Sequence, residues 1–559
     1  MKRFFTLFAM VAFAASMMWA TWVPSDTESI KLDKEGTDGQ VQMKTIRTDD
    51  GKIILSWLRG ERVDDVFSYR LHLQIFDANG NAMFGDEGII VCDKRTRTWT
   101  TDYALALAPN GDILLAYTDV RNDPNEENAE SYLYRYDQQG NPVWDADGIL
   151  FPSGRIHETA FSTEDIAPAI CVSGDNIYAA VNHTEYYMEK ATEDNWSPSP
   201  WFPNQQMPDS VQVTSSAWLV VALNNDGSVK GEAPMSLDSK ILLMNPAIDG
   251  NIYMVYNSAD QGLEAQLIDP ELTNQWEDVV TVEETPLTRG AFMPTPLAGL
   301  NENDILMLSY EVPTDWYGYQ VVNYLTPEGE TAPEAISLAG GVDGDAGSAA
   351  MGVKENRAMV AWEYAYSSSL YYMKVNVATD FNTYFWEGDL EYGMNLEEND
   401  MWGFTPVKVI PTADGWVVLY GNLQSWNGAN FMVVSIDDFG EILWTKQICE
   451  DNFKSSGFSV VYDDKNAYIF YTQEVQYDDQ WNEIPGSAGM YVMCIDITGN
   501  QDATSIDEMP TDARVKSVEI YTVDGRRVNE MVPGVNIIRT TDENGNVTSK
   551  KVFKQRSIF

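Results

Sequence analysis

The sequence predicts an all-β protein: a β-propeller of eight blades, followed by a small C-terminal β-sandwich-like module. Residues 21–510 show no helical hydrophobic period of useful length, and Gly, Asn and Asp recur at strand-sized intervals. A strand-and-turn pattern also repeats along the chain. A single open sheet of so many strands would curl or leave exposed edges, whereas radial repetition of four-stranded sheets buries their faces.

Two stretches carry the repeat most clearly, residues 49–91 and 109–151. In both, a Gly turn precedes an apolar strand, a polar loop follows, and an aromatic-rich strand leads to a second Gly turn. Weaker copies give eight units in all, and seven blades plus an irregular unit is the alternative. An aromatic residue that would wedge between neighbouring sheets recurs after the second turn at Phe84, Trp144, Trp276, Trp386 and Trp444. The units resemble the degenerate propeller repeats of secreted bacterial proteins, a resemblance that implies a fold and little about activity.

The N-terminus has the features of a signal peptide, with Lys2 and Arg3 ahead of a short apolar stretch and cleavage expected after Ala20. No later stretch is long and apolar enough to span a bilayer. A formal net charge of -49 argues against nucleic acid as a partner, because neutralising phosphates requires an excess of Lys and Arg. We therefore expect residues 1–20 to direct export and residues 21–504 to form an extracellular propeller.

The four cysteines are spread along the chain without a Cys-x-x-Cys pair, so no disulfide scaffold and no zinc site is expected. Buried free thiols are the favoured interpretation, and one bridge between Cys449 and Cys494 is the alternative. Calcium has weak support from the segments 145–148 and 340–347, which cluster acidic residues with Gly turns but lack the spacing of a calcium loop. Solvated turn acids are the favoured interpretation there, and no cofactor is predicted.

The predicted binding face is the one that carries the b–c loops, where the strands of a blade are named a to d from the central channel outward. The a–b and c–d turns are mostly tight, so the loops long enough to bind a ligand lie on the b–c face. These loops are rich in aromatic residues and carboxylates, which suit sugar rings and also suit a protein partner. The long insertion 185–210 is the first candidate for a lid or ligand contact. The predicted ligand contacts are Tyr186, Tyr187, Trp196, Trp201, Trp316, Tyr319, Tyr364, Trp426 and Trp481.

Sequence motifs of known catalytic machinery are missing, among them Gly-x-Ser-x-Gly and His-Glu-x-x-His. A glycosidase needs only two suitably placed carboxylates, which 85 acidic residues make impossible to locate from sequence. We therefore predict a secreted or surface-attached propeller that binds a ligand, carbohydrate before protein, without catalysis. A glycoside hydrolase or lyase using acidic residues of the same face is the first alternative, and a structural or adhesion protein is the second.

The C-terminal segment differs from the rest in charge. Residues 511–559 hold nine Lys and Arg against six Asp and Glu, a net charge of +3, so 505–512 is a composition boundary and the predicted linker. Residues 513–559 have a strand entering a tight Asp-Gly turn, a Gly entry into a second strand, and an Asn-Gly hairpin into a basic last strand.

This segment resembles the C-terminal sorting domain of cargo of the type IX secretion system. The matching pieces are VEIYTVDGRRV, PGVNIIRT and NGNVTSKKVF, and the residues that carry the signal would be Asp524, Gly525, Arg526, Arg527, Gly534, Lys550 and Lys551. The resemblance implies passage through the periplasm and across the outer membrane of a Gram-negative bacterium, with the type IX machinery as partner. Release or attachment at the cell surface would follow.

Overall fold

The computed structural model describes residues 22–554 outside a set of short ranges, and for some strand residues, Tyr319 and Tyr364 among them, it describes the backbone alone. The ranges outside the description are 1–21, 23, 26–28, 33–39, 64–65, 97–102, 124–127, 155, 193–194, 198–205, 259–261, 286, 288–295, 314–317, 333–334, 343–348, 356, 365–368, 378–383, 387–403, 423–430, 438–441, 450–457, 474, 476–481, 483, 485–486, 500–514, 523–525, 529–533, 543–546 and 555–559.

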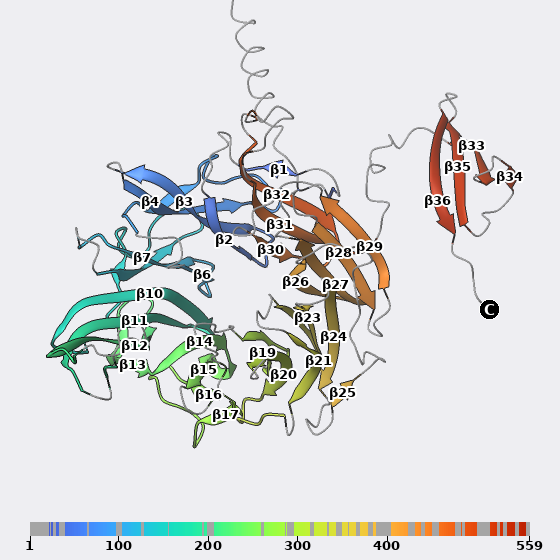
Figure 1. Ribbon diagram of the computed structural model, residues 1–559. Coiled ribbons are helices and arrows are strands. Elements are labelled where there is room, and N and C mark those ends of the chain that lie inside the picture. The colour runs from blue at the N-terminus through green and yellow to red at the C-terminus, as the bar shows by residue number, and fades with distance from the viewer. Residues whose placement is uncertain are drawn as a thin grey trace, which may run out of the picture. The chain divides into compact units, whose positions relative to one another are not determined.

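The described chain is divided into two units, Met1–Gly499 and Asn500–Phe559. The described residues of the first unit form eight four-stranded antiparallel sheets, which follow one another around a ring (Figure 1). The first sheet consists of β2 (Gln40–Arg47), β3 (Ile53–Val63), β4 (Val66–Phe76) and β5 (Ile89–Cys92), and the second of β6 (Tyr103–Leu107), β7 (Ile113–Asp119), β8 (Glu130–Tyr136) and β9 (Ile149–Leu150). The third sheet consists of β10 (Ala160–Ser173), β11 (Asn176–Lys190), β12 (Ser210–Leu223) and β13 (Val229–Leu237). The fourth consists of β14 (Ser239–Pro246), β15 (Ile252–Ser258), β16 (Gly262–Ile268) and β17 (Val280–Glu283). A single 3₁₀ turn among the described residues, η2 (Ile248–Gly250), joins β14 to β15.

The second half of the ring follows the same order. Its sheets are β18 (Leu297–Leu300), β19 (Leu306–Pro313), β20 (Gly318–Leu325) and β21 (Ile336–Val342); β22 (Ala349–Lys354), β23 (Arg357–Tyr364), β24 (Ser369–Val377) and β25 (Tyr384–Trp386); β26 (Phe404–Thr412), β27 (Gly415–Asn422), β28 (Phe431–Asp437) and β29 (Ile442–Cys449); and β30 (Ser459–Tyr462), β31 (Asn466–Gln473) and β32 (Gly489–Asp496) with β1 (Ile30–Lys31).

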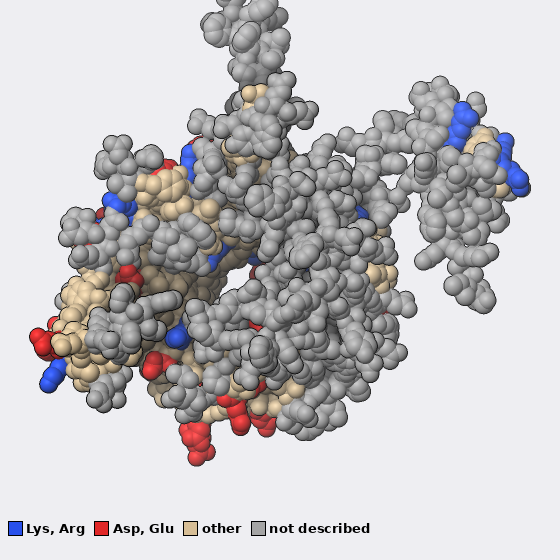
Figure 2. Space-filling view, in the orientation of Figure 1, with Lys and Arg blue, Asp and Glu red and all other residues tan. Residues whose placement is uncertain are grey.

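The ring is closed through both ends of the unit. The innermost strand of each sheet contacts the innermost strand of the next, and β30 contacts β2, so the sheets are the eight blades of a propeller. The outermost strand of the last blade is β1, which pairs with β32 through Ile30 and Val492. Closing a ring with strands from both chain ends leaves no open seam between first and last blade. The predicted all-β propeller class is therefore confirmed, and Figure 2 shows the visible face hollowed at its centre.

Burial follows from the packing of blade on blade. All seven residues of β7 are buried, because a middle strand is covered by neighbouring blades on both of its faces. The outermost strand β9 of the same blade alternates between half-buried and exposed. The cores are mostly formed between adjacent blades, as where Leu71 and Leu73 of β4 join Tyr117 and Tyr134 of the next blade in one cluster.

Four of the five recurring aromatic residues lie between blades, as the repeat predicts, and the side chain of the fifth, Trp386, is not described. Trp144 follows the c–d turn of its blade, and its ring contacts the position where Gly227 of the next blade's c–d turn would carry a Cβ atom, 3.1 Å away. The same contact joins Phe84 to Gly140, Trp276 to Gly329 and Trp444 to Gly499. A glycine is required at Gly227 for two reasons, the space taken by Ile149 Cδ1 and the indole, and a φ of +85°. The repeat is therefore a device for stacking each blade on its neighbour.

Three cysteines are buried free thiols, namely Cys92, Cys171 and Cys494. The alternative of a Cys449–Cys494 bridge is wrong, because Cys494 is not in a disulfide. Burial raises the pKa of Cys171 and of Cys494 to about 12, and burial with the nearby Asp119 carboxylate raises that of Cys92 to about 11.

These thiols are expected to resist alkylation in the folded protein, because the reactive species is the thiolate and the sulfur is inaccessible. In a Cys449→Ser variant, a thiol reagent at pH 8 should label no cysteine in the native state and three after denaturation, counted by mass spectrometry. Fewer than three labels after denaturation would show that a disulfide forms among the remaining cysteines.

The second unit is one four-stranded antiparallel sheet in the order β34–β33–β35–β36. Its strands are β33 (Val515–Thr522), β34 (Arg527–Val528), β35 (Gly534–Asp542) and β36 (Val547–Lys554). The three predicted strand segments are present, and a second sheet of the predicted sandwich is not found among the described residues. Gly534 opens β35, as the predicted Gly entry requires, and pairs with Lys554 of β36.

Candidate functional site

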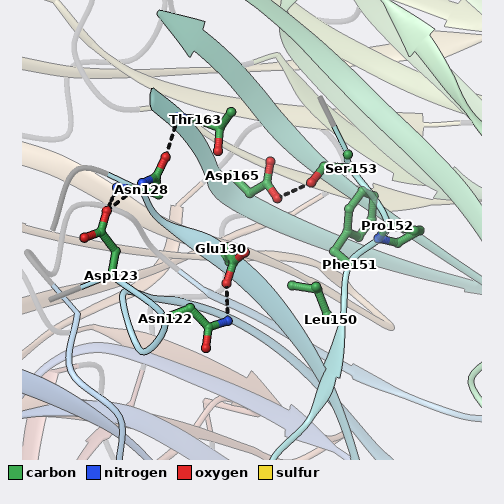
Figure 3. Close-up of a pocket in the computed structure, with 11 residues that line it drawn as sticks. Asn122, Asp123, Asn128, Glu130, Leu150, Phe151, Pro152, Ser153, Thr163 and Asp165 are labelled. Atoms are coloured by element: carbon green, nitrogen blue, oxygen red, sulfur yellow. Dashed lines mark hydrogen bonds between the residues drawn. The ribbon is translucent and has the colours of Figure 1, made fainter. Parts of the chain in front are cut away.

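A pocket of about 620 Å³ lies between the second and third blades (Figure 3). Strands of a blade run alternately up and down, so its b–c loop and its connection to the next blade leave the same face. The pocket is formed by both of these connections, and it therefore lies on the predicted binding face. Its lining residues are Asn122, Asp123, Asn128, Glu130, Leu150, Phe151, Pro152, Ser153, Gly154, Thr163 and Asp165.

The b–c loop of the second blade supplies an amide, and the first residue of β8 supplies a carboxylate that this amide holds in place. The Asn122 side-chain amide donates to Glu130 Oε2 at 2.7 Å and to the Tyr132 hydroxyl oxygen at 2.8 Å. The Tyr132 hydroxyl donates to the same Glu130 oxygen at 2.9 Å. Since both donors converge on one carboxylate oxygen, the orientation of Glu130 in the pocket is fixed.

The base of this loop is joined to β10, the first strand of the next blade. Asn128 donates to Asp123 Oδ2 from its backbone and its side-chain nitrogens, at 2.9 and 2.6 Å, and its side-chain oxygen Oδ1 accepts a hydrogen bond from the backbone amide of Thr163 at 3.0 Å. Ala129 and Asp165 continue this seam through backbone hydrogen bonds between the two blades. The blade boundary is thus sealed beneath the pocket by hydrogen bonds.

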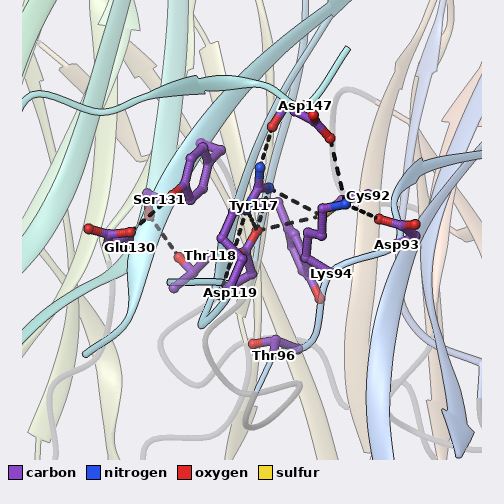
Figure 4. Close-up of polar contacts among 12 residues, drawn as sticks. Cys92, Asp93, Lys94, Thr96, Tyr117, Thr118, Asp119, Glu130, Ser131 and Asp147 are labelled. Atoms are coloured by element: carbon purple, nitrogen blue, oxygen red, sulfur yellow. Dashed lines mark hydrogen bonds and ion pairs between the residues drawn. The ribbon is translucent and has the colours of Figure 1, made fainter. Parts of the chain in front are cut away.

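Behind the loop lies a buried ion pair (Figure 4). Asp119, at the end of β7, is fully buried and accepts two hydrogen bonds from Arg121 Nε, at 2.9 and 3.0 Å. The guanidinium also lies 3.6 Å from the centre of the Tyr132 ring and donates to the Tyr134 hydroxyl at 2.7 Å. A charge buried this deeply is stable only when paired, so this group anchors the root of the b–c loop.

The third blade contributes a chain of hydrogen-bonded side chains that starts in the pocket. Ser153 donates from its hydroxyl to Asp165 Oδ2 at 2.6 Å (Figure 3). Asp165 Oδ1 lies 2.6 Å from His183 Nδ1, and His183 Nε2 lies 3.2 Å from Glu185 Oε1. Glu185 Oε2 in turn lies 2.6 Å from His157 Nδ1. Two of the three histidines of the chain therefore belong to one network with two buried carboxylates.

Register and strand periodicity build this network. Asp165 of β10 is paired with His183 of β11, which brings their side chains to neighbouring positions. His183 and Glu185 are two residues apart on one strand and therefore point to the same face. Serine acts as a donor to Asp165 and does not contact a histidine nitrogen, so the arrangement is not that of a Ser-His-Asp nucleophile.

The network shifts the pKa of two of its members. Burial lowers the pKa of His183, but the hydrogen bonds and charges of Asp165 and Glu185 outweigh burial and raise it above its ordinary value. Burial raises the pKa of Glu185, but hydrogen bonds from the backbone amides of Ile156 and His157 and from both histidine rings outweigh it and lower that pKa. Both shifts favour the charged form of the group concerned.

Three of the nine predicted ligand contacts have described side chains, namely Tyr186, Tyr187 and Trp196. Tyr186 donates from its hydroxyl to Glu164 at 3.1 Å, and Tyr187 is buried with its ring stacked 4.2 Å from that of His157. Trp196 is half-buried beyond the end of β11. None of these three lines the pocket. Tyr319 lies on β20 and Tyr364 at the end of β23, while Trp201, Trp316, Trp426 and Trp481 lie outside the described residues.

The sequence reasoning missed the polar residues that line the pocket, although it placed their loop on the binding face. One signal was available: His183 and Glu185 alternate along a strand whose other residues are mostly apolar, and a charged pair at such positions requires partners in the core. The partner Asp165 lies 18 residues away and the second histidine 26, so only the strand pairing identifies them.

The segment 145–148, weighed as a calcium loop, is a tight turn in which Asp145 accepts the amide of Asp147 at 3.0 Å. The Asp147 carboxylate lies 3.6 Å from the ammonium of Lys94. Across the described parts of the chain, no three His, Cys, Asp or Glu side chains are grouped so that they could hold a metal ion. Nor does any described helix have the length and apolar character to cross a membrane.

Comparison with known proteins identifies no family, since no family model matches the chain and no curated protein matches it. Several solved structures are similar to it. A puromycin hydrolase is 11% identical with a TM-score of 0.37, covering 94% of this chain and 62% of that one. The polysaccharide lyase Uly1 is 11% identical with a TM-score of 0.38, covering 82% and 90%. The microbial sialidase Hz136 is 11% identical with a TM-score of 0.31, covering 86% of this chain and 99% of that one. Similarities this weak support no inference about what this chain binds.

Proposed function

We propose that this protein binds an extracellular carbohydrate in the pocket between its second and third blades. The observation that carries the proposal is the lining, which combines amide, hydroxyl and carboxylate side chains around a concave site. A sugar hydroxyl both donates and accepts, so it is matched by a carboxylate beside an amide, as with Glu130 and Asn122. A volume of about 620 Å³ lies within the range of small-molecule sites.

The charge of the lining residues limits which sugars the pocket is expected to bind. Asp123, Glu130 and Asp165 face the pocket, and none of its lining residues is Lys, Arg or His. Carboxylates without a lining cation repel sulfated or uronic sugars, so neutral or amine-bearing sugars are the ligands this site favours.

The experiment that tests the proposal is a glycan array followed by calorimetry with each sugar that binds. Glu130→Gln is expected to weaken binding about 10- to 100-fold, because a hydrogen bond to a charged group contributes about 1.5–3 kcal/mol. Glu271→Gln is the matched control, since it removes the same charge from an exposed residue in a c–d turn of the fourth blade. Binding of no glycan, or equal affinity of the Glu130→Gln variant and the wild type, would contradict the proposal.

A second candidate is a glycoside hydrolase or lyase, because Glu130 and Asp165 are two carboxylates on one pocket. The same sugars, incubated with the protein and analysed for released products, distinguish the two functions. Release that is lost in both Glu130→Gln and Asp165→Asn would favour the enzyme, and binding without release would favour the binder. The aromatic residues predicted from the sequence remain proposed contacts for longer ligands, testable with Trp201→Ala and Trp316→Ala.

We further propose that the C-terminal unit directs export through the type IX machinery to the outer-membrane surface or the medium. Its support is the sequence resemblance together with the division of the chain into two units. Arg526 and Arg527, which carry part of the matching motif, are exposed and thus accessible to a recognition protein.

A further inference from the structure

His183 has an unusual environment for a buried histidine. It is 1% exposed, and each of its two ring nitrogens lies within hydrogen-bonding distance of a carboxylate oxygen. A carboxylate oxygen accepts hydrogen bonds, so both ring nitrogens of His183 must donate. A histidine that donates from both nitrogens is an imidazolium, and this one is a buried cation shared by Asp165 and Glu185.

The two carboxylates hold one wall of the pocket. We define the wall segment as Ser153, Gly154, Ile156 and His157, which precede β10. Its first residue donates from the Ser153 hydroxyl to Asp165 at 2.6 Å. Its last two donate backbone amides to Glu185, from Ile156 at 2.6 Å and from His157 at 2.8 Å. Both attachments thus end on the two carboxylates that His183 joins.

We propose that the His183 imidazolium is a positioning residue for the pocket, which holds the wall segment in place through Asp165 and Glu185. Loss of its proton leaves two buried carboxylates facing each other with one fewer hydrogen bond between them, which weakens both attachments. The wall segment then opens, and the Ser153 side of the pocket is no longer formed. This inference rests on the proposed function only in taking this pocket as the ligand site.

The charged groups around His183 make the direction of the pH effect clear. Asp165 faces it from β10 and Glu185 from its own strand, His157 lies beyond Glu185 in the wall segment, and the paired residue on β12 is Ala217. Asp123 and Glu130 line the same pocket as Asp165. The pKa of His183 is raised above 6.5, so the stability it contributes is complete below about that pH and is lost as the pH rises through the raised pKa.

At acidic pH, the stability of the closed wall segment depends on Glu185. Its pKa is lowered below 4.5, so the stability it contributes is complete above that pH and is lost as the pH falls through the lowered value. The wall segment is therefore expected to be closed in mildly acidic to neutral medium and to open towards alkaline pH.

Hydrogen–deuterium exchange of the free full-length protein tests the inference without any sugar, so a failed ligand screen leaves the test intact. The measured quantity is the exchange rate of the Ile156 and His157 amides divided by that of an unstructured peptide at the same pH. Above the folded-state pKa of His183 this ratio is expected to rise about tenfold per pH unit, because opening is then linked to loss of one proton. In His183→Gln the ratio should be at least tenfold higher at pH 6 and independent of pH between 6 and 9.

His72→Gln is the matched control, because His72 is another histidine buried to 2% exposure and it stacks on Trp57 in the first blade. Burial lowers the pKa of His72 to about 4, so it does not titrate in this range. Its replacement should leave exchange of the wall segment unchanged. Wild-type protection of both amides in His183→Gln would overturn the inference, as would a wild-type ratio that does not rise with pH up to the pH at which the propeller itself unfolds. If His183→Gln fails to fold, the pH dependence of exchange in the wild type tests the inference by itself.

Discussion

Deletion of residues 511–559 is expected to trap the protein in the periplasm while leaving the propeller folded. The described residues of the C-terminal unit form their own sheet, and the propeller ring is closed by β1 and β32 without it. Removing the unit therefore takes away the proposed recognition element without opening any blade. Cell fractionation locates the truncated chain, and circular dichroism with a thermal melt of the purified protein checks that its fold is intact.

A variant with two substitutions tests whether the proposed signal residues are recognised, without removing the whole C-terminal unit. Replacing Arg526 and Arg527 together by Ala should retain the chain in the periplasm. Arg539 is an exposed arginine on β35 that lies in the matching segment PGVNIIRT but is not one of the seven proposed signal residues, so Arg539→Ala should be exported normally. Surface delivery of the truncated chain at the wild-type level would refute the role proposed for this unit.

Replacement of Trp144 by Ala is expected to destabilise the propeller by about 3–5 kcal/mol, the range measured for removing a buried aromatic side chain. The indole is 9% exposed, packs against Gly227 of the next blade and donates to the carbonyl of Asn225 at 2.9 Å. The variant loses this hydrogen bond and leaves a cavity between two blades. Urea unfolding followed by fluorescence gives the change in midpoint.

Val143 provides the comparison, because it precedes Trp144 in the same turn but is 47% exposed. Val143→Ala should change the stability by less than about 0.5 kcal/mol. Equal midpoints for the two variants would mean that the recurring aromatic residue does not hold neighbouring blades together.

The repeat allowed the fold to be predicted because its elements are local. Turn glycines, apolar strands and the wedge positions such as Trp144 recur in the sequence at the spacing at which they recur in space, so each blade could be identified from its own residues. The closure of the ring could not be predicted from the sequence. The strand that completes the last blade, β1, is separated from its partner β32 by more than 450 residues, and a two-residue strand has no periodic signal of its own.

The pocket lies on the face that the loop lengths identified, but none of the residues that line it was among the predicted ligand contacts. Loop lengths identified the face, because only the b–c loops and interblade connections are long enough to form a pocket. The aromatic content of those loops then directed the search to rings such as Tyr187, which is buried against His157 instead of facing the pocket. Aromatic residues on loops pack wherever they remove most apolar surface from water, and composition alone does not say where that is.

The sequence by itself determined the β class, the repeat, the face on which the long loops lie, and the charge contrast of the C-terminal segment. All of these depend on residues close together in the chain or on sums over many residues. Only the tertiary structure determined the ring closure, the free thiol of Cys494 and the network through Asp165, His183, Glu185 and His157. Buried polar groups require specific partners, and the register between β10 and β11 sets which distant side chains meet.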